Sequence, residues 1–228
     1  MKNRKVMVVL STVIIVLLIG IAIVLSPKND NYSDNLLGIN YDIKGNLSSL
    51  KYDSENPIVA MYIENYGSIV IELFPAVAPN TVNNFISLVE KGFYDNNSMH
   101  RLVPDFVLQG GDPTGTGSGG PGYTIKGEFT SNGYENSLSH EKWVVSMARS
   151  GDPDSAGSQF FICLGNDSFL DGNYAAFGRV IDGFDNINDI IDYEKIADEE
   201  SGKLSRNLII KKAIIDLKNK TYDDVEKK

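Results

Sequence analysis

Short apolar segments separated by glycine-containing turns restrict the fold of this 228-residue chain more than any other feature. Segments of this length, bounded by Gly, Pro, Asn or Asp, are typical of β-strands. They lie at 58–63, 69–73, 98–103, 106–109, 143–148, 159–164, 175–180 and 208–217. Many short strands with few helices favour a mainly antiparallel sheet that closes on itself, because closure leaves no strand edge exposed to other chains.

Two segments have helical rather than strand periodicity. After Pro79, apolar residues recur at i, i+3, i+4 and i+7 from Val82, and Gly92 follows the last of them. This spacing predicts an amphipathic helix that begins near Pro79 and ends near Lys91. A second short helix is expected over 185–192, which carries three isoleucines.

The extreme N-terminus predicts a membrane anchor. Residues 6–25 carry no charge, and Lys2, Arg4 and Lys5 precede them. Twenty helical residues at about 1.5 Å each span roughly 30 Å, the thickness of a bilayer core. The apolar run is longer than that of a signal peptide, and residues 22–24 (AIV) are not an Ala-x-Ala cleavage site, so a retained anchor is favoured over cleavage and secretion.

The charges around this segment predict its orientation. Basic residues lie before the span, and Lys28 is the only one in the fifteen residues after it. By the positive-inside rule, residues 1–5 are cytoplasmic, 6–25 cross the cell membrane once, and everything after Leu25 is extracytoplasmic. Residues 26–56 are rich in Asn, Asp and Ser and are expected to form a linker to a folded domain at 57–218, which a polar tail at 219–228 follows.

Charge and cysteine content exclude several classes of function. The formal net charge is −9 and the pI is about 4.7, so the chain repels phosphate backbones and a nucleic-acid partner is not expected. Cys163 is the only cysteine, which rules out an intramolecular disulfide and a cysteine-based metal site. Within the apolar run Phe160–Leu164, Cys163 is expected to be a small buried side chain.

Two other motifs carry little weight. Residues 115–120 (GTGSGG) fit G-x-G-x-x-G, but Pro121-Gly122 follows where a dinucleotide fingerprint would open a helix, so this segment is interpreted as a surface loop. His100 and His140 have no H-E-x-x-H spacing, and G-x-S-x-G is absent, so neither a metal site nor a hydrolase is predicted.

Three segments, taken in order, are far more specific than the strand pattern. They are Met99–Asp112 (MHRLVPDFVLQGGD), Val145–Arg149 (VSMAR), and Gly157–Cys163 (GSQFFIC) with Phe169–Gly178 (FLDGNYAAFG). Together they resemble the cyclophilin family of peptidyl-prolyl cis/trans isomerases, over about residues 57–218. The resemblance implies a closed eight-stranded antiparallel barrel capped by two short helices, acting on X-Pro peptide bonds without a cofactor or metal.

The resemblance also implies the site residues. Arg101 matches the family's catalytic arginine, and the catalytic set is expected to be Arg101, Phe106, Gln109 and Phe161. The residues expected to bind substrate are His100, Val107, Met147, Ala148, Arg149, Gln159, Phe169, Leu170 and Tyr174. The apolar members match the walls and rim of a proline pocket, the glutamines match the polar groups beside it, and the segment from Met147 to Arg149 matches a strand that pairs with the substrate backbone.

Four of these positions depart from the commonest family residues. Phe169 replaces a frequent Trp, so the indole N–H donor is absent and only weak cyclosporin binding is expected. Tyr174 replaces a frequent His and Val107 a frequent Met, and both keep an apolar wall. Arg149 replaces a frequent Asn, and its charge is expected to alter the choice of residue before proline.

These features leave three functions open. The first is an isomerase acting on exported or surface proteins near the membrane. The second is a non-catalytic module or chaperone that binds proline-bearing segments in the same groove. The third is a structural surface protein that uses the barrel as a scaffold, because a fold does not fix a function.

Overall fold

The computed structural model describes residues 54–228, in which nine strands and two α-helices occur. The strands are β1 (Ile58–Ile63), β2 (Gly67–Leu73), β3 (Asn97–Val103), β4 (Val107–Asp112), β5 (Val144–Met147), β6 (Phe160–Cys163), β7 (Ala176–Asp182), β8 (Ile196–Asp198) and β9 (Lys203–Asp216). The α-helices are α2 (Pro79–Glu90) and α3 (Phe184–Tyr193), and the short 3₁₀ turns are η2 (Thr130–Asn132) and η3 (Ser168–Leu170).

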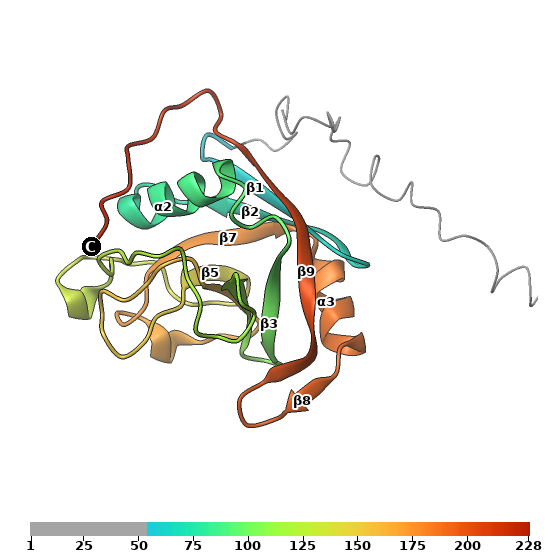
Figure 1. Cartoon of the computed structure of the whole chain (residues 1–228). Helices are drawn as coiled ribbons and strands as arrows, with labels where there is room; N and C mark the ends of the chain where they lie inside the picture. Colours follow the sequence, from blue (N-terminus) through green and yellow to red (C-terminus); the bar gives the residue numbers. More distant parts are fainter. Residues whose placement is uncertain (1–53) are drawn as a thin grey trace, which may run out of the picture. The chain divides into compact units, whose positions relative to one another are not determined.

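Eight of these strands form a closed antiparallel barrel (Figure 1). Neighbours follow the order β1-β2-β7-β5-β6-β4-β3-β9, and β9 pairs again with β1, for example through Ala60 and Ile214. The closed eight-stranded barrel with two helices, expected from the sequence, is therefore confirmed. Within the described part of the chain, closure gives each barrel strand two hydrogen-bonded neighbours. No barrel strand therefore has a free edge that could pair with another chain.

The last strand, β9, begins earlier than the sequence predicts. β9 begins at Lys203 rather than at residue 208, and its first residues pair with β8 in a hairpin at the end of the barrel (Ile196↔Leu204). Residues 203–207 contain no continuous apolar run, and Leu204 is the only buried residue among them. The strand pattern in this segment is therefore weak. The hairpin turn approaches β3, where the Leu102 N–H donates to the Gly202 carbonyl at 2.8 Å.

Helix α2 begins where the sequence predicts, and a distant carboxylate completes its N-terminus. The side chain of Glu128 accepts hydrogen bonds from the N–H groups of Asn80 (3.0 Å) and Thr81 (2.7 Å) and from the Thr81 hydroxyl (2.6 Å). A carboxylate at this end satisfies unpaired backbone donors and complements the helix dipole. The expected second helix is α3, which packs against β2, while α2 packs against β9.

The barrel interior is filled by one apolar core with an aromatic centre. Phe85 of α2 lies 5.1 Å from Tyr94, 5.4 Å from Phe160 and 5.0 Å from Phe177, measured between ring centroids. Offset and edge-to-face pairs of this kind stabilise a core beyond the burial of their area. The helix is thereby fixed to strands β6 and β7, and β6 also carries Phe161, which lines the cavity described below.

The C-terminal residues lie along the domain rather than away from it. Asn80 and Glu226 exchange two hydrogen bonds, at 3.0 and 2.8 Å, and Tyr222 and Val225 pack against the main core. The Lys228 ammonium pairs with Asp154. The segment expected as a polar tail is therefore in contact with the folded domain.

The predicted anchor at 6–25 and most of the predicted linker at 26–56 lie outside the described residues. Within residues 54–228, no helix combines the length and apolar character that a membrane span requires.

Candidate active site

Strand alternation places the candidate site on the outer face of the barrel wall. In β3, β4 and β6, the side chains of Leu102, Leu108 and Ile162 belong to the main core. Residues next to them in sequence therefore face outward, because successive side chains of a strand point to opposite faces. Cross-strand pairing then aligns Arg101 with Gln109 and Gln109 with Phe161, so these three side chains stand in a row.

A β-bulge at His100 makes this arrangement possible. Met99 pairs with Gly110 and Arg101 with Gln109, so His100 is an extra residue in β3. Met99 and Leu102 both enter the core, which strict alternation would not allow. A bulge re-aims the next side chain, and here it turns Arg101 to the outer face.

The guanidinium of Arg101 is held in a defined orientation. Nε donates to the carbonyl of Ser201 at 2.8 Å, and Nη1 donates to Oε1 of Gln109 at 3.2 Å. Nε2 of Gln109 donates to Oε1 of Gln159 at 3.0 Å, and Nε2 of Gln159 donates to two carbonyls of the 113–120 loop, those of Gly117 and Gly119. Partial burial lowers the pKa of Arg101, but from so high a usual value that the group stays a cation.

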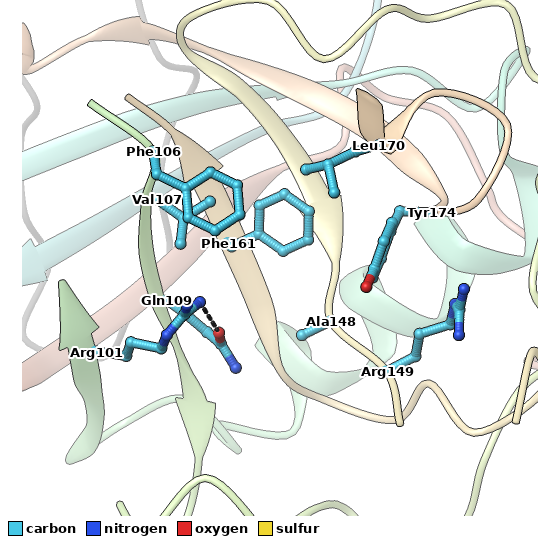
Figure 2. Close-up of a pocket in the computed structure, with 9 residues that line it drawn as sticks. All are labelled: Arg101, Phe106, Val107, Gln109, Ala148, Arg149, Phe161, Leu170 and Tyr174. Atoms are coloured by element: carbon cyan, nitrogen blue, oxygen red, sulfur yellow. Dashed lines mark hydrogen bonds between the residues drawn. The ribbon is translucent and has the colours of Figure 1, made fainter. Parts of the chain in front are cut away.

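A cavity of about 200 Å³, lined by both apolar and polar side chains, opens beside this arginine (Figure 2). Its lining consists of Arg101, Phe106, Val107, Gln109, Ala148, Arg149, Phe161, Leu170 and Tyr174. Figure 2 shows Arg101 and Gln109 on one side and Tyr174 and Arg149 on the other, with Phe161 between them. Phe161 is 5% exposed. Phe106 forms part of the rim, and its ring centroid lies 5.6 Å from the guanidinium carbon of Arg101.

Polar residues support Phe161 from behind. The His140 ring lies nearly parallel to Phe161, with centroids 6.1 Å apart. Its Nδ1 donates to the carboxylate of Asp171 at 2.8 Å, which leaves Nε2 to accept from the Ser146 hydroxyl at 3.0 Å. Burial lowers the pKa of His140 although Asp171 opposes this, so the imidazole is neutral near pH 7.

Asp112 organises the loop that follows β4. Its buried carboxylate accepts hydrogen bonds from the N–H groups of Thr114 (2.7 Å), Thr116 (3.0 Å) and Gly117 (2.6 Å). Burial alone would raise the pKa of Asp112, but these hydrogen bonds and one from Gly119 hold it well below its usual range. The expectation that 115–120 is a loop rather than the start of a helix is confirmed.

The structure brings most of the predicted site residues together, but not all. Gln159 lies beside the cavity through its bond to Gln109, and Phe169 stacks on Phe106 at 5.6 Å with 69% of its surface exposed. Met147 does not reach the cavity, because alternation in β5 turns its side chain into the main core. His100 is buried next to Arg101, and within residues 54–228 its Nδ1 has no hydrogen-bond partner.

Sequence patterns alone do not identify the residues that support Phe161 from behind. Ser146 and Asp171 lie inside the quoted motifs without an expected role, and the sequence raises His140 only as a metal or hydrolase residue. Their signal is weak, because each is a single polar side chain and their contacts form only in the folded barrel. The carbonyl of Ser201, which holds Arg101, could not be recognised since any residue type supplies one.

This geometry suits noncovalent work on a small apolar ring. The cavity offers burial, which contributes about 25 cal/mol per Å² of apolar surface, and a fixed cation stands at its edge. Asp171, His140 and Ser146 form a chain of hydrogen bonds like that of a hydrolase. Ser146 is fully buried, however, so its hydroxyl cannot reach a bound substrate. The site is therefore better suited to holding and polarising a group than to nucleophilic chemistry.

Comparisons with known proteins agree with this geometry. The "Peptidyl-prolyl cis-trans isomerase B" of Bacillus subtilis is 46% identical over 123 residues, which cover 54% of this chain and 82% of that protein. The "Peptidyl-prolyl cis-trans isomerase-like 1" of Gibberella zeae is 46% identical over 122 residues, covering 53% of this chain and 74% of that protein.

A solved structure extends the agreement to the fold. A cyclophilin-type peptidyl-prolyl cis-trans isomerase of Cryptosporidium parvum, crystallised in the presence of the dipeptide Ala-Pro, is 34% identical with a TM-score of 0.61. The match covers 70% of this chain and 98% of that one. The family model described as "Cyclophilin type peptidyl-prolyl cis-trans isomerase/CLD" matches residues 58–215. The chain belongs to the cyclophilin-type peptidyl-prolyl cis-trans isomerase family.

Proposed function

We propose that this isomerase acts on X-Pro bonds of exported or surface polypeptides, close to the membrane in which its own N-terminus is anchored. The observation that supports the catalytic part is the oriented guanidinium of Arg101 at the edge of a cavity that Phe106, Phe161 and Leu170 help to line. The observation that carries the location is the charge-free segment 6–25 with basic residues before it.

The reaction needs no bond to be broken. Resonance gives a peptide C–N bond a rotational barrier of about 18–20 kcal/mol, and X-Pro bonds exchange over tens to hundreds of seconds. In the twisted transition state the prolyl nitrogen regains a lone pair, which a fixed N–H donor can bind. Stabilising this state by about 7 kcal/mol more than the planar amide would accelerate exchange roughly 10⁵-fold.

Arg101 fits the donor role. Its Nε and Nη1 are already bound, and within residues 54–228 no hydrogen bond engages Nη2. The proline ring would be held by Phe106, Phe161 and Leu170 while the preceding residue turns. A guanidinium has a rigid donor geometry and a permanent charge, so it requires no proton transfer.

The catalytic part is tested by adding the full chain to a proline-containing peptide and following cis-to-trans exchange. Acceleration in proportion to enzyme concentration supports the proposal. Peptide binding without acceleration would favour the binding-module alternative. The absence of both binding and acceleration would favour a scaffold role.

The location is tested in intact cells with an impermeant protease. The folded domain should be cleaved from outside, while an epitope placed before residue 6 should be protected until the cells are opened. Protection of the folded domain in intact cells would reject the proposed orientation.

A further inference from the structure

The charged side chains that line the cavity are both cationic. Among the described residues of the lining, Arg101 and Arg149 carry charge and no carboxylate is present. The whole chain has a formal net charge of −9, so the sign at the cavity is opposite to that of the molecule. A ligand in the cavity experiences the nearest charges most strongly, since exposed charges farther than about 8–10 Å are largely screened at physiological salt.

Arg149 is fixed as firmly as Arg101. Its Nε donates to the carbonyl of Asn173 at 2.9 Å, and Nη1 donates to the carbonyl of Ser150 at 2.8 Å. The guanidinium carbon also lies 4.7 Å from the Tyr174 ring centroid and 5.2 Å from that of Phe129. A half-buried guanidinium held by carbonyls and aromatic faces loses little further freedom when it binds a partner.

Neighbouring carboxylates are engaged elsewhere. Asp154, in the loop after Arg149, pairs with Lys228 and accepts a hydrogen bond from Asn132 at 2.7 Å. Asp171 is bound by His140 and by the Ser139 hydroxyl at 2.7 Å. Lys228 partly compensates the charge of Asp154, whereas the donors to Asp171 are neutral. Arg149 is the charged side chain that lines the cavity on the side opposite Arg101.

We propose that Arg149 makes this isomerase select prolyl segments that carry an acidic side chain within two residues of the proline. The inference rests on the proposed function and adds a substrate class to it. The proline ring occupies the apolar centre of the cavity, so its flanking residues pass over the rim. One or two residues of extended chain cover about 3.3–7 Å, a span that brings a flanking Glu or Asp side chain within reach of the Arg149 guanidinium.

The test compares peptides that share one scaffold and differ in charge. Glu, Gln or Lys is placed one or two residues before the proline, or directly after it, and kcat/KM is measured with the full chain at low salt. At one or more positions the Glu peptide should exceed the Gln peptide by about three- to fivefold, as expected for a partly exposed ion pair. The preference should shrink towards one at about 1 M salt, where the Debye length is about 3 Å.

Variants assign the preference to this side chain. The Glu-to-Gln ratio should fall to about one in Arg149→Gln and should be partly kept in Arg149→Lys, which retains charge without the planar donor group. Arg179→Gln is the matched control, because it removes one exposed positive charge that does not line the cavity, and it should leave the ratio unchanged. The use of a ratio within each variant cancels any general loss of activity.

The outcomes separate this inference from the proposed function. No acceleration of any peptide would overturn the proposed function itself. Acceleration of the Gln peptides with no preference for Glu, or with a preference for Lys, would overturn only the role of Arg149. A preference for Glu that persists in Arg149→Gln would also overturn the role of Arg149. If that variant does not fold, a preference that is insensitive to salt in the unmodified chain would overturn this role instead.

Discussion

Arg101 is oriented by acceptors from two different parts of the chain. Gln109 comes from the adjacent strand, and the Ser201 carbonyl comes from a hairpin one hundred residues away in sequence. A cation held in this way needs little reorganisation when charge develops in a transition state, which is how preorganised donors accelerate reactions.

The first prediction concerns Gln109. Replacing it with Leu removes the acceptor for Nη1 of Arg101, and kcat should fall about tenfold with a smaller change in KM, since hydrogen bonds to charged groups contribute about 1.5–3 kcal/mol. Gln109→Glu keeps an acceptor oxygen and should retain more activity than the Leu variant. Steady-state exchange kinetics check both, and an unchanged kcat in Gln109→Leu would show that this bond does not position Arg101.

A second prediction concerns Phe169 at the rim. This ring stacks on Phe106 and is largely exposed, but it lacks the N–H donor of an indole. Phe169→Trp should therefore strengthen cyclosporin binding by about tenfold, the worth of one added hydrogen bond. Calorimetric titration of both proteins measures this, and a nanomolar Kd for the unmodified chain would contradict it.

At the residue scale, the motifs located most of the candidate site but not its supports. Arg101, Val107, Gln109 and Phe161 line one cavity because they occupy outward positions on adjacent strands, and residues of the motifs that lie outside the strands complete the lining. Met147 shows the limit of the approach, since motif membership does not state which face of a strand a side chain occupies. His140 shows the other limit, because its partners Asp171 and Ser146 meet only in the folded barrel.

At the scale of elements, the β8–β9 hairpin fixes the edge of the site. Gly202 has φ +72°, and a Cβ there would lie 2.4 Å from Cγ2 of Val103 and 2.8 Å from the Leu102 carbonyl oxygen. Only glycine lets the turn approach β3 this closely. The same turn presents the Ser201 carbonyl to Arg101.

The third prediction is that Gly202→Ala lowers kcat more than its effect on stability would suggest. The added Cβ pushes the turn away from β3 and takes the Ser201 carbonyl from Arg101. Gly133→Ala is the control, because Gly133 also has positive φ (+78°) but has open space around its Cβ position and does not line the cavity. Backbone strain should cost both variants about 1–2 kcal/mol in unfolding free energy, and Gly202→Ala should lose more because its Cβ also meets Val103 and the Leu102 carbonyl.

Kinetics and urea unfolding of these two variants separate the effects. Activity should fall in Gly202→Ala and remain near the original in Gly133→Ala. Equal kcat values in the two variants would show that the hairpin has no part in positioning Arg101.

Helices and barrel strands were predictable, whereas β8 was not. Helix α2 has a strong apolar repeat from Val82 and a Pro at its start, so its position followed from local signals alone. β8 has three residues and none is fully buried, so it carries no apolar pattern and forms through its pairing with β9. The bulge at His100 was equally invisible, because it is defined only by the register of two strands.

At the scale of the whole molecule, two histidines link stability to pH. His100 and His140 are the only histidines in the chain, and both are buried. Burial lowers the pKa of each, although Asp112 opposes this at His100 and Asp171 and Asp167 oppose it at His140. Below the ordinary histidine pKa of about 6.5, the unfolded chain therefore binds more protons than the folded one.

The fourth prediction is that the unfolding free energy decreases as pH falls from about 7.5 to 5.5, a window in which most carboxylates stay ionised. The contribution of the neutral histidines is fully present above pH 6.5 and is lost as pH falls through their lower folded pKa values. Urea midpoints across this range measure it. His100→Gln should reduce the slope, and a midpoint that stays constant or rises on acidification would contradict the prediction.

In the proposed mechanism, catalysis by the whole barrel depends on Arg101. The most direct measurement is exchange spectroscopy by NMR on a proline peptide bound to the full chain and to Arg101→Ala, with the peptide Kd determined in parallel. We expect the unmodified chain to exchange the bound isomers rapidly, and Arg101→Ala to bind the peptide with similar affinity while exchange falls by at least about a hundredfold. Rapid exchange that persists in Arg101→Ala, with the fold intact, would contradict the role given to this guanidinium.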